Sequence, residues 1–153
     1  MQARRPENYY HDNYGITVPH SDVVEMVEKH GVKPCKTLDL GCGQGRNTLY
    51  LADRGFEMTS YDISAGMIET LTGIMAKEDI TDIDVSQYDI NSASIAGNYD
   101  LILSTVVLMF VNRDAIPSII PNMQAHTNSG GYNLIVAAMS TEAYPFEGFP
   151  FTF

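Results

Sequence analysis

Short apolar runs alternate with amphipathic stretches along the chain. The apolar runs, which we expect to form strands, cover residues 36–40, 56–61, 83–88, 99–104 and 132–139. The run at 99–104 (YDLILS) is almost continuously apolar, which is typical of a central strand buried on both faces. Strands that alternate with helices predict an α/β fold with an open parallel sheet and right-handed crossovers. We expect the strand order 3-2-1-4-5, with ligands at the carboxyl ends of the strands.

Apolar residues between these runs recur at helical spacing. The clearest stripe comprises Met67, Ile68, Leu71, Ile74 and Met75. We expect helices at residues 21–31, 44–54, 64–75 and 113–126. Ser21 and Ser64 are expected N-caps, and Pro121 predicts a kink or a restart in the last helix. The pair Gly130–Gly131 is expected to form the turn into the last strand.

A glycine-rich turn follows the first expected strand and contains Gly41, Gly43 and Gly45. Glycine is needed where the backbone turns with positive φ, or where a ligand approaches without a Cβ in the way. The next helix directs its free N–H groups at the turn, which favours a negatively charged or carboxylate-bearing ligand. Arg46 stands where the dinucleotide fingerprint has its third glycine, and no Lys-Ser or Lys-Thr pair completes a Walker loop. The spacing therefore argues against nicotinamide, flavin and nucleoside triphosphate sites.

Acidic residues stand at the carboxyl ends of three expected strands. Asp39 precedes the glycine turn, Asp62 ends the second strand, and Asp89 ends the third. At the end of its strand, Asp39 is expected to be available to a cationic group. The arrangement resembles the S-adenosylmethionine site of class I methyltransferases. The resemblance implies that Asp39 attracts the amino group of the donor, that Asp62 accepts from the ribose hydroxyls, and that Asp89 with the backbone of Ile90 binds the adenine edge. The alternatives are a glycine turn that serves packing alone and a turn-capping role for Asp89.

Further candidate donor-binding residues flank these acids or end the fourth strand: Arg46, Asn47, Ile63, Met67, Ser104 and Thr105. Met67 is expected either to pack on the adenine face or to belong to the core. The residues that end the fourth strand are expected to face the reactive end of the donor.

Composition disfavours several other classes of protein. The net charge of −10, from 19 acidic and 9 basic residues, repels polyanions and argues against nucleic-acid partners. No apolar run approaches the ~20 residues of a membrane span, and the first residues lack the apolar core of a signal peptide, so we expect a cytoplasmic protein. Cys35 and Cys42 form no CxxC motif, and the histidines have no ligand spacing, so neither a disulfide framework nor a metal site is expected.

The chain is expected to form a single domain, with its sheet and helices in residues 20–153. Residues 1–19 are expected to be a loop-like N-terminal arm that carries Tyr9, Tyr10 and Tyr14. Two interpretations of the arm stay open: it is a lid over a ligand, or it is pinned to the core. A chain of this length buries roughly two thirds of its unfolded surface in one core.

Several segments together resemble the bacterial tellurite-resistance methyltransferase family. They are residues 7–10 (ENYY), 38–47 (LDLGCGQGRN), 101–110 (LILSTVVLMF), 130–139 (GGYNLIVAAM) and 148–151 (GFPF). The glycine motif is shared by all class I methyltransferases, whereas residues 103–110 and 132–139 are more particular to this family. The resemblance implies a Rossmann-like fold and methyl transfer from S-adenosylmethionine to tellurite and to selenium oxyanions, as detoxification. A methyltransferase for another small molecule, such as a thiol, and a donor-binding but inactive fragment are the alternatives.

The family continues past residues 149–151 with a final antiparallel hairpin and a His- and Arg-bearing stretch, which have no counterpart in this sequence. No catalytic residue is expected, because a tellurium or selenium lone pair is already a good nucleophile. Candidate oxyanion ligands are Arg46, His20, Tyr9 and Arg113, each with a surface or structural role as the alternative. The last strand would be left as an apolar edge, so we expect a homodimer or poor solubility.

Overall fold

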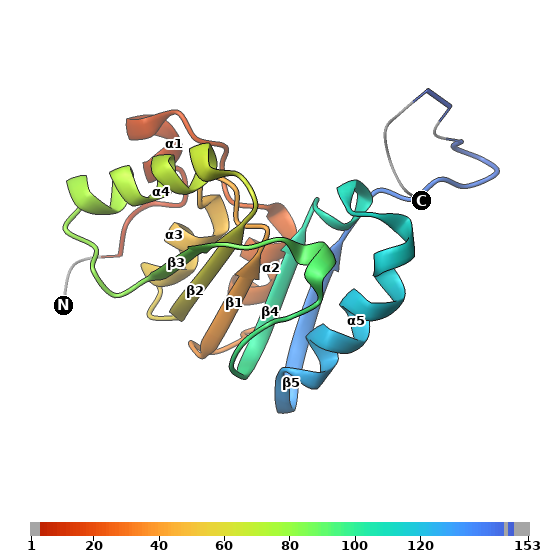
Figure 1. The fold of residues 1–153 in the computed structure, drawn as a ribbon. Helices are drawn as coiled ribbons and strands as arrows, with labels where there is room; N and C mark the ends of the chain where they lie inside the picture. Colours follow the sequence, from red (N-terminus) through yellow and green to blue (C-terminus); the bar gives the residue numbers. More distant parts are fainter. Residues whose placement is uncertain (1–3, 146, 149–153) are drawn as a thin grey trace.

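The computed structural model describes residues 4–145, 147 and 148, which fold around one parallel sheet (Figure 1). Five strands follow the order β3-β2-β1-β4-β5, and every pair is parallel, so the expected order is confirmed. The strands are β1 (Lys36–Leu40), β2 (Glu57–Asp62), β3 (Asp84–Gln87), β4 (Tyr99–Thr105) and β5 (Thr127–Val136). The helices are α1 (Tyr9–Tyr14), α2 (Ser21–Glu28), α3 (Arg46–Ala52), α4 (Ala65–Lys77) and α5 (Ile116–Ala125).

Two hydrophobic clusters cover the two faces of the sheet. Leu101 and Leu103 of β4 belong to the cluster with α1 to α4, whereas Ile102 belongs to the cluster with α5. This division follows from the strand geometry, because successive side chains point to opposite faces. Figure 1 shows α5 in front of the sheet with α2 and α3 behind it. Since both faces are covered, β4 is buried along nearly its whole length, as its apolar sequence predicts.

The N-terminal arm is not loop-like as expected, because residues 9–14 form α1. Tyr9 Oη donates to Glu78 at 3.0 Å, and Tyr14 Oη donates to the same carboxylate. Arg5 donates to Glu78 at 2.8 Å and to Asp53 at 2.6 Å. Although burial raises the pKa of Glu78, these hydrogen bonds outweigh it and lower the pKa below its usual value. Of the two interpretations of the arm, the pinned one describes this segment.

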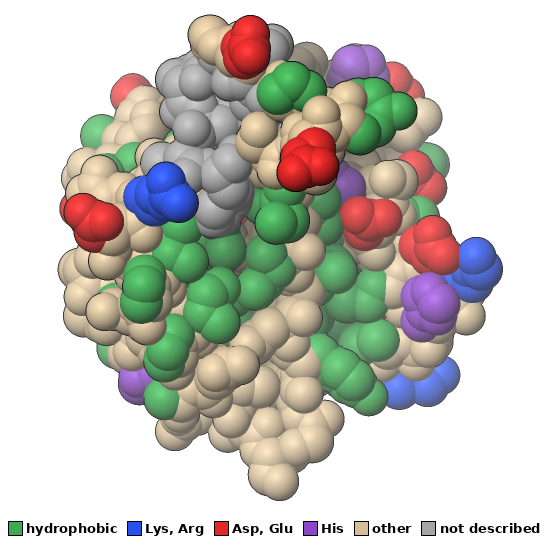
Figure 2. Space-filling model, turned by 90° about the vertical axis from the view of Figure 1, so that its right-hand side faces the viewer, with side chains coloured by type: hydrophobic (Ala, Val, Ile, Leu, Met, Phe, Trp, Pro, Cys, Tyr) green, Lys and Arg blue, Asp and Glu red, His purple; other side chains and the backbone are tan. Residues whose placement is uncertain are grey.

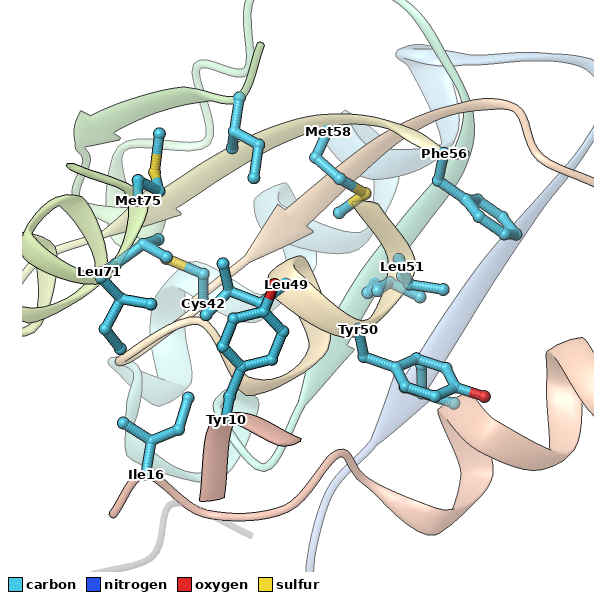
Figure 3. Close-up of a cluster of buried hydrophobic side chains, with 14 of the residues drawn as sticks. Tyr10, Ile16, Cys42, Leu49, Tyr50, Leu51, Phe56, Met58, Leu71 and Met75 are labelled. Atoms are coloured by element: carbon cyan, nitrogen blue, oxygen red, sulfur yellow. The ribbon is translucent and has the colours of Figure 1, made fainter. Parts of the chain in front are cut away.

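Side chains of the N-terminal segment also enter the core (Figure 3). Tyr10 is 5% exposed and Ile16 is 2% exposed, and both point toward Leu49 and Leu71 on α3 and α4. A six-residue helix has too few turns to be stable alone, so tertiary contacts stabilise α1. This is why the local pattern did not predict it.

Three local expectations near the helix ends need correction. The N-cap of α2 is His20, whose Nδ1 accepts from Asp22 N at 3.2 Å, and not Ser21, which is the first helical residue. The helix α5 continues through Pro121, so the expected restart is absent, and the turn before it (Arg113–Ala115) is a 3₁₀ helix. Ser64 caps α4 as expected, because its Oγ accepts from the N–H of Met67.

The edge strand β5 begins earlier than expected and contains the Gly130–Gly131 pair within it. The pair forms no turn into the strand; the pairing with β4 shifts register between Tyr99 and Leu101. A Cβ on Gly131 would lie 2.6 Å from Asp100 O, so only glycine fits this irregular crossing. The end of β5 lies at Val136, so the three residues up to Met139 are not strand. No helix of the described part is long and apolar enough to cross a membrane.

Candidate functional site

The glycine turn lies between the carboxyl end of β1 and the start of α3, and all three of its glycines have positive φ. A Cβ on Gly41 would lie 2.5 Å from Val107 Cγ2, and one on Gly45 would lie 2.4 Å from Leu71 Cδ1. At Gly43 nothing lies within 4 Å of an added Cβ. Packing therefore explains Gly41 and Gly45, whereas Gly43 borders open space where a ligand can approach the backbone.

Asp39 lies beneath this turn and is only 1% exposed, although we expected its side chain to be available at the strand end. Its Oδ2 accepts from Thr48 Oγ1 at 2.8 Å, and Thr48 in turn lies 2.7 Å from Ser60 Oγ. Its Oδ1 is buried without a partner among the described residues. Burial raises the pKa of Asp39 to about 6, the Thr48 hydrogen bond and the Arg46 charge oppose this rise, and the charge of Asp62 adds to it. An unpartnered buried oxygen is costly, so Oδ1 is suited to accept from a ligand.

Asp62, at the end of β2, connects the glycine turn to the start of α4. Its Oδ2 accepts from Gly43 N and its Oδ1 from Ser64 N, both at 2.8 Å. These two backbone donors hold the carboxylate in one orientation. Each oxygen keeps further acceptor capacity, so the group can still accept from a ligand hydroxyl.

Asp89 is exposed and caps the 3₁₀ turn Ile90–Ser92. Its Oδ1 accepts from Asn91 N and from Asn91 Nδ2, both at 2.9 Å. The turn-capping alternative therefore describes its contacts in this structure. The side chain of Ile90 is buried in the core at 8% exposure, so only its backbone is free to contribute to a site.

Several large apolar side chains at the carboxyl edge are exposed. Met67 is 40% exposed and Ile63 is 60% exposed, beside Asp62 and the start of α4. The core interpretation of Met67 is therefore wrong, and its exposure is compatible with packing on a flat ring. Val106, which follows β4, is 38% exposed and has φ of +58°, a strained conformation for a β-branched residue.

The end of β4 meets the start of α3 and the start of α2. Thr105 Oγ1 accepts from Asn47 Nδ2, and Asn47 Oδ1 accepts from the N–H of His20, both at 2.9 Å. His20, Asn47 and Thr105 were each expected to contact a ligand. The structure brings the three together, but these hydrogen bonds are made to one another. Ser104 is fully buried, and its Oγ has no partner among the described residues.

The basic candidates are dispersed. Arg46 is half-buried, its Nη1 lies 3.5 Å from Val18 O, and its charge acts on Asp39. Arg113 is exposed in the 3₁₀ turn before α5. Tyr9 is bound to Glu78 at the far end of α4, about 20 Å along that helix from Asp62, so its phenol does not join the site. Of these, Arg46 is the one whose charge lowers the pKa of Asp39.

Sequence reasoning missed the residues that support the site. Thr48 and Ser60 hold Asp39, and Val107 closes over Gly41. A partial signal was available for Thr48, because it follows the glycine turn on the helix face that also carries buried residues. The contact of Val107 depends on how β4 lies beside β1, which no local pattern reports.

Two hollows of the described residues lie away from these acids. One of about 850 Å³ and one of about 370 Å³ are both lined by Val32, Lys33 and Pro34, the loop that precedes β1. Neither is lined by Asp39, Asp62 or Asp89. The larger hollow contains equal numbers of acidic and basic residues, so it has no charge preference for an anion. We place the candidate site by its oriented and unpartnered acids, because they supply the specific chemistry.

Among the described residues, no group of three or more His, Cys, Asp or Glu could hold a metal ion.

Comparison with known proteins identifies similar sequences. A model of the family described as tellurite resistance protein TehB matches residues 2–153. The "Probable S-adenosyl-L-methionine-dependent methyltransferase TehB" of Haemophilus influenzae (strain 10810) is 52% identical over 149 residues, which cover 97% of this chain and 51% of the relative. "Hemagglutinin 1" of Eikenella corrodens is 44% identical over 146 residues, 95% of this chain and 47% of the relative. The chain thus spans about half the length of the curated relatives it matches.

Solved structures show the same architecture. The crystal structure of TehB from Haemophilus influenzae superimposes with a TM-score of 0.89 at 52% identity and covers 96% of this chain and 51% of that one. The glycopeptide N-methyltransferase MtfA complexed with S-adenosyl-L-methionine has a TM-score of 0.68 at 21% identity, over 80% of this chain and 55% of that one. At that identity the second likeness concerns the fold alone.

Proposed function

Because the chain belongs to the tellurite resistance protein TehB family, we propose that it binds S-adenosylmethionine and transfers its methyl group to tellurite and to selenium oxyanions. The observation that carries the proposal is Asp39, a buried carboxylate with an unpartnered oxygen directly beneath the glycine turn. The name of the Haemophilus influenzae relative, a probable methyltransferase that depends on the same donor, supports it.

The residues present fit the donor. Asp39 Oδ1 is suited to accept from its amino group, and Asp62, held by two backbone N–H groups, is suited to accept from the ribose hydroxyls. Gly43 leaves space for close approach to the backbone. The exposed side chains of Ile63 and Met67 offer apolar surface for the adenosine rings, and Asp89 with the backbone of Ile90 offers acceptors and donors for the adenine edge.

The protein contributes to the reaction by positioning the donor and the acceptor. The bound donor supplies a methyl group on a sulfonium, which an in-line nucleophile can take. Alignment at about 3–3.5 Å is the main requirement of such a transfer. The acids at the strand ends are proposed to hold the donor, and the residues after β4 are proposed to shape the space for the acceptor. A tellurium or selenium lone pair needs no proton removed, so no general base is required of the chain.

Arg46 is the best placed cation for an oxyanion. It is the first residue of α3, beside the glycine turn, and its charge already acts on Asp39. In a chain with a net charge of −10, an anion needs such local positive charge. His20, at the start of α2, is the second candidate for binding the oxyanion. Its N–H donates to Asn47, which follows Arg46 in α3, so His20 lies near the same turn.

Donor binding and acceptor use are tested separately. Calorimetry with S-adenosylhomocysteine is expected to show micromolar binding, and methyl transfer from labelled S-adenosylmethionine is expected with tellurite and selenite. Transfer to thiols but not to oxyanions would show that the proposed acceptor is wrong and that the proposed donor site is right. Binding without transfer would identify a donor-binding but inactive fragment, and no binding would reject the proposal.

The affinity for the donor is expected to rise with pH. Asp39 is half protonated near pH 6 in the free protein, and a cationic amino group favours its ionised form. Because the ionised fraction of such a group rises about tenfold between pH 5 and pH 7, the affinity for S-adenosylhomocysteine should rise by about as much. Calorimetry at pH 5, 6 and 7 measures this, and Asp39→Asn should bind more weakly with a flat profile. A wild-type profile as flat as the variant's would contradict the assignment of Asp39.

We also propose that this chain self-associates through the edge of β5. Residues 115–141 contain no Asp, Glu, Lys or Arg, although the whole chain has a charge of −10. Figure 2 shows this side of the molecule, where hydrophobic side chains gather in the centre and charged ones lie toward the rim. Tyr132 is 61% exposed and Ile135 is 39% exposed. Among the described residues no strand pairs with the outer edge of β5, and an uncharged strand edge of this kind is a template for a second copy. The strand itself carries no charged side chain that would oppose this approach.

Sedimentation velocity at increasing concentration is expected to show a dimer of the wild type. Ile135→Lys places a charge on the edge strand and should shift the population to monomer. Thr72→Lys, on the exposed face of α4, adds the same charge elsewhere and should leave the dimer intact. A wild type that stays monomeric at the highest concentration would contradict this proposal.

A further inference from the structure

A buried chain of hydrogen bonds joins three segments that lie far apart in the sequence. The amide of Asn47 accepts from the N–H of His20 and donates to Thr105 Oγ1, both at 2.9 Å. Asn47 is 2% exposed and Thr105 is 6% exposed, so water does not compete for these bonds. A backbone N–H can only donate, which fixes the amide with its oxygen toward His20 and its nitrogen toward Thr105.

The segment at residues 16–20 is held by the first two residues of α3. Ile16 and Pro19 are buried, whereas Val18 between them is 37% exposed. Arg46 approaches the carbonyl of Val18, and Asn47 holds the N–H of His20. The segment therefore lies against the start of α3, next to the glycine turn.

At its other end, this series of hydrogen bonds reaches the loop that follows β4. Thr105 is the last residue of β4, and it precedes the strained Val106 and then Val107, which closes over Gly41. Asn47 thus connects residues 16–20 to the loop that borders the turn from the other side. One side chain therefore joins two segments that border the glycine turn.

We propose that Asn47 is a positioning residue that holds residues 16–20 against the end of β4 and so assembles the acceptor side of the site before ligands bind. The inference rests on the proposed function. Both ends of its amide are engaged by the protein: the oxygen accepts from His20 N and the nitrogen donates to Thr105 Oγ1. It acts on the ligand through its neighbours and not by contact.

The donor acids depend on different partners. Asp39 is held by Thr48, and Asp62 is held by Gly43 and Ser64. Disturbing Asn47 should therefore loosen the acceptor side and leave donor affinity nearly unchanged. A role in donor binding would instead weaken donor and acceptor steps together.

Asn47→Ala removes both bonds, and Asn47→Asp keeps an acceptor for His20 and can accept from the Thr105 hydroxyl. In Asn47→Ala we expect hydrogen exchange of the His20 amide, followed by NMR, to become at least tenfold faster. The KM for tellurite should rise at least fivefold, and the Kd for S-adenosylhomocysteine should change less than threefold. Asn47→Asp is expected to restore slow exchange at His20. Thr105→Val breaks one bond without changing α3 and serves if Asn47→Ala fails to fold.

Unchanged exchange at His20 in both Asn47→Ala and Thr105→Val would overturn the inference. So would a loss of donor affinity in Asn47→Ala as large as the loss in kcat/KM. A wild type that fails to bind S-adenosylhomocysteine would instead reject the proposed function. In that case the exchange rates at His20 would still decide whether Asn47 holds the segment.

Discussion

Asp62→Ala is expected to abolish measurable binding of S-adenosylhomocysteine. The carboxylate accepts from Gly43 N and Ser64 N, so its removal frees both the turn and the start of α4. It also removes the acceptors proposed for the ribose hydroxyls. A hydrogen bond to a charged group contributes about 1.5–3 kcal/mol, so the loss of two weakens binding by more than about 100-fold. Calorimetry measures the affinity, and thermal unfolding confirms that the variant is folded.

Asp84→Ala is the matched control for charge. Asp84 is an exposed acid on the neighbouring strand β3, and its removal changes the net charge by the same amount. We expect wild-type affinity in this variant. Micromolar affinity retained in Asp62→Ala, or an equal loss in both variants, would refute the placement of the donor at Asp62.

The second large effect is expected at the glycine turn, where two similar substitutions should fail in different ways. Gly43→Ala adds a methyl group to open space, at the cost of about 1–2 kcal/mol for a non-glycine residue with φ of +56°. Because the donor is proposed to approach the backbone here, affinity for S-adenosylhomocysteine should fall at least tenfold in a folded protein. Thermal unfolding and calorimetry on the same sample separate stability from binding.

Gly41→Ala should instead lower stability. Its Cβ would lie 2.5 and 2.8 Å from the two methyl groups of Val107, which is far inside van der Waals contact. We expect a loss of about 3 kcal/mol or more in the free energy of unfolding, since strain and overpacking add. Adding Val107→Ala should recover part of the stability. Gly43→Ala that binds with wild-type affinity would show that the donor does not approach this residue.

The positions of the strands and of the three acids that follow them could be predicted because both depend on local signals. A parallel strand buried on both faces is apolar throughout, as in β4, and needs no partner to be recognised. Acids that follow such strands must meet at one edge of the sheet, so Asp39, Asp62 and Asp89 could be placed together from spacing alone. Their partners could not, because Thr48, Ser64 and Asn91 are selected by the exact positions of neighbouring atoms.

The errors fall where tertiary contacts outweigh local preference. The helix α1 is too short to form alone, and it is stabilised because Glu78 and Asp53 accept from its tyrosines and from Arg5. The strand β5 includes Gly130–Gly131 as an irregularity, because its pairing with β4 holds on both sides of the glycines, at Thr127 and again from Tyr132. A glycine pair predicts a turn from the local sequence, but the pairing of the flanking residues with a neighbouring strand decides whether a turn forms.

The sequence by itself determined the alternation of strands and helices, the turn that needs glycine, and the acids at the strand ends, because each depends on a repeat or on neighbours in the chain. Only the tertiary structure decided which of these groups are oriented, buried or unpartnered. Asp39 is both buried and half satisfied, and Asn47 is engaged with His20 and Thr105, since hydrogen bonds between distant segments exist only once the sheet brings those segments together.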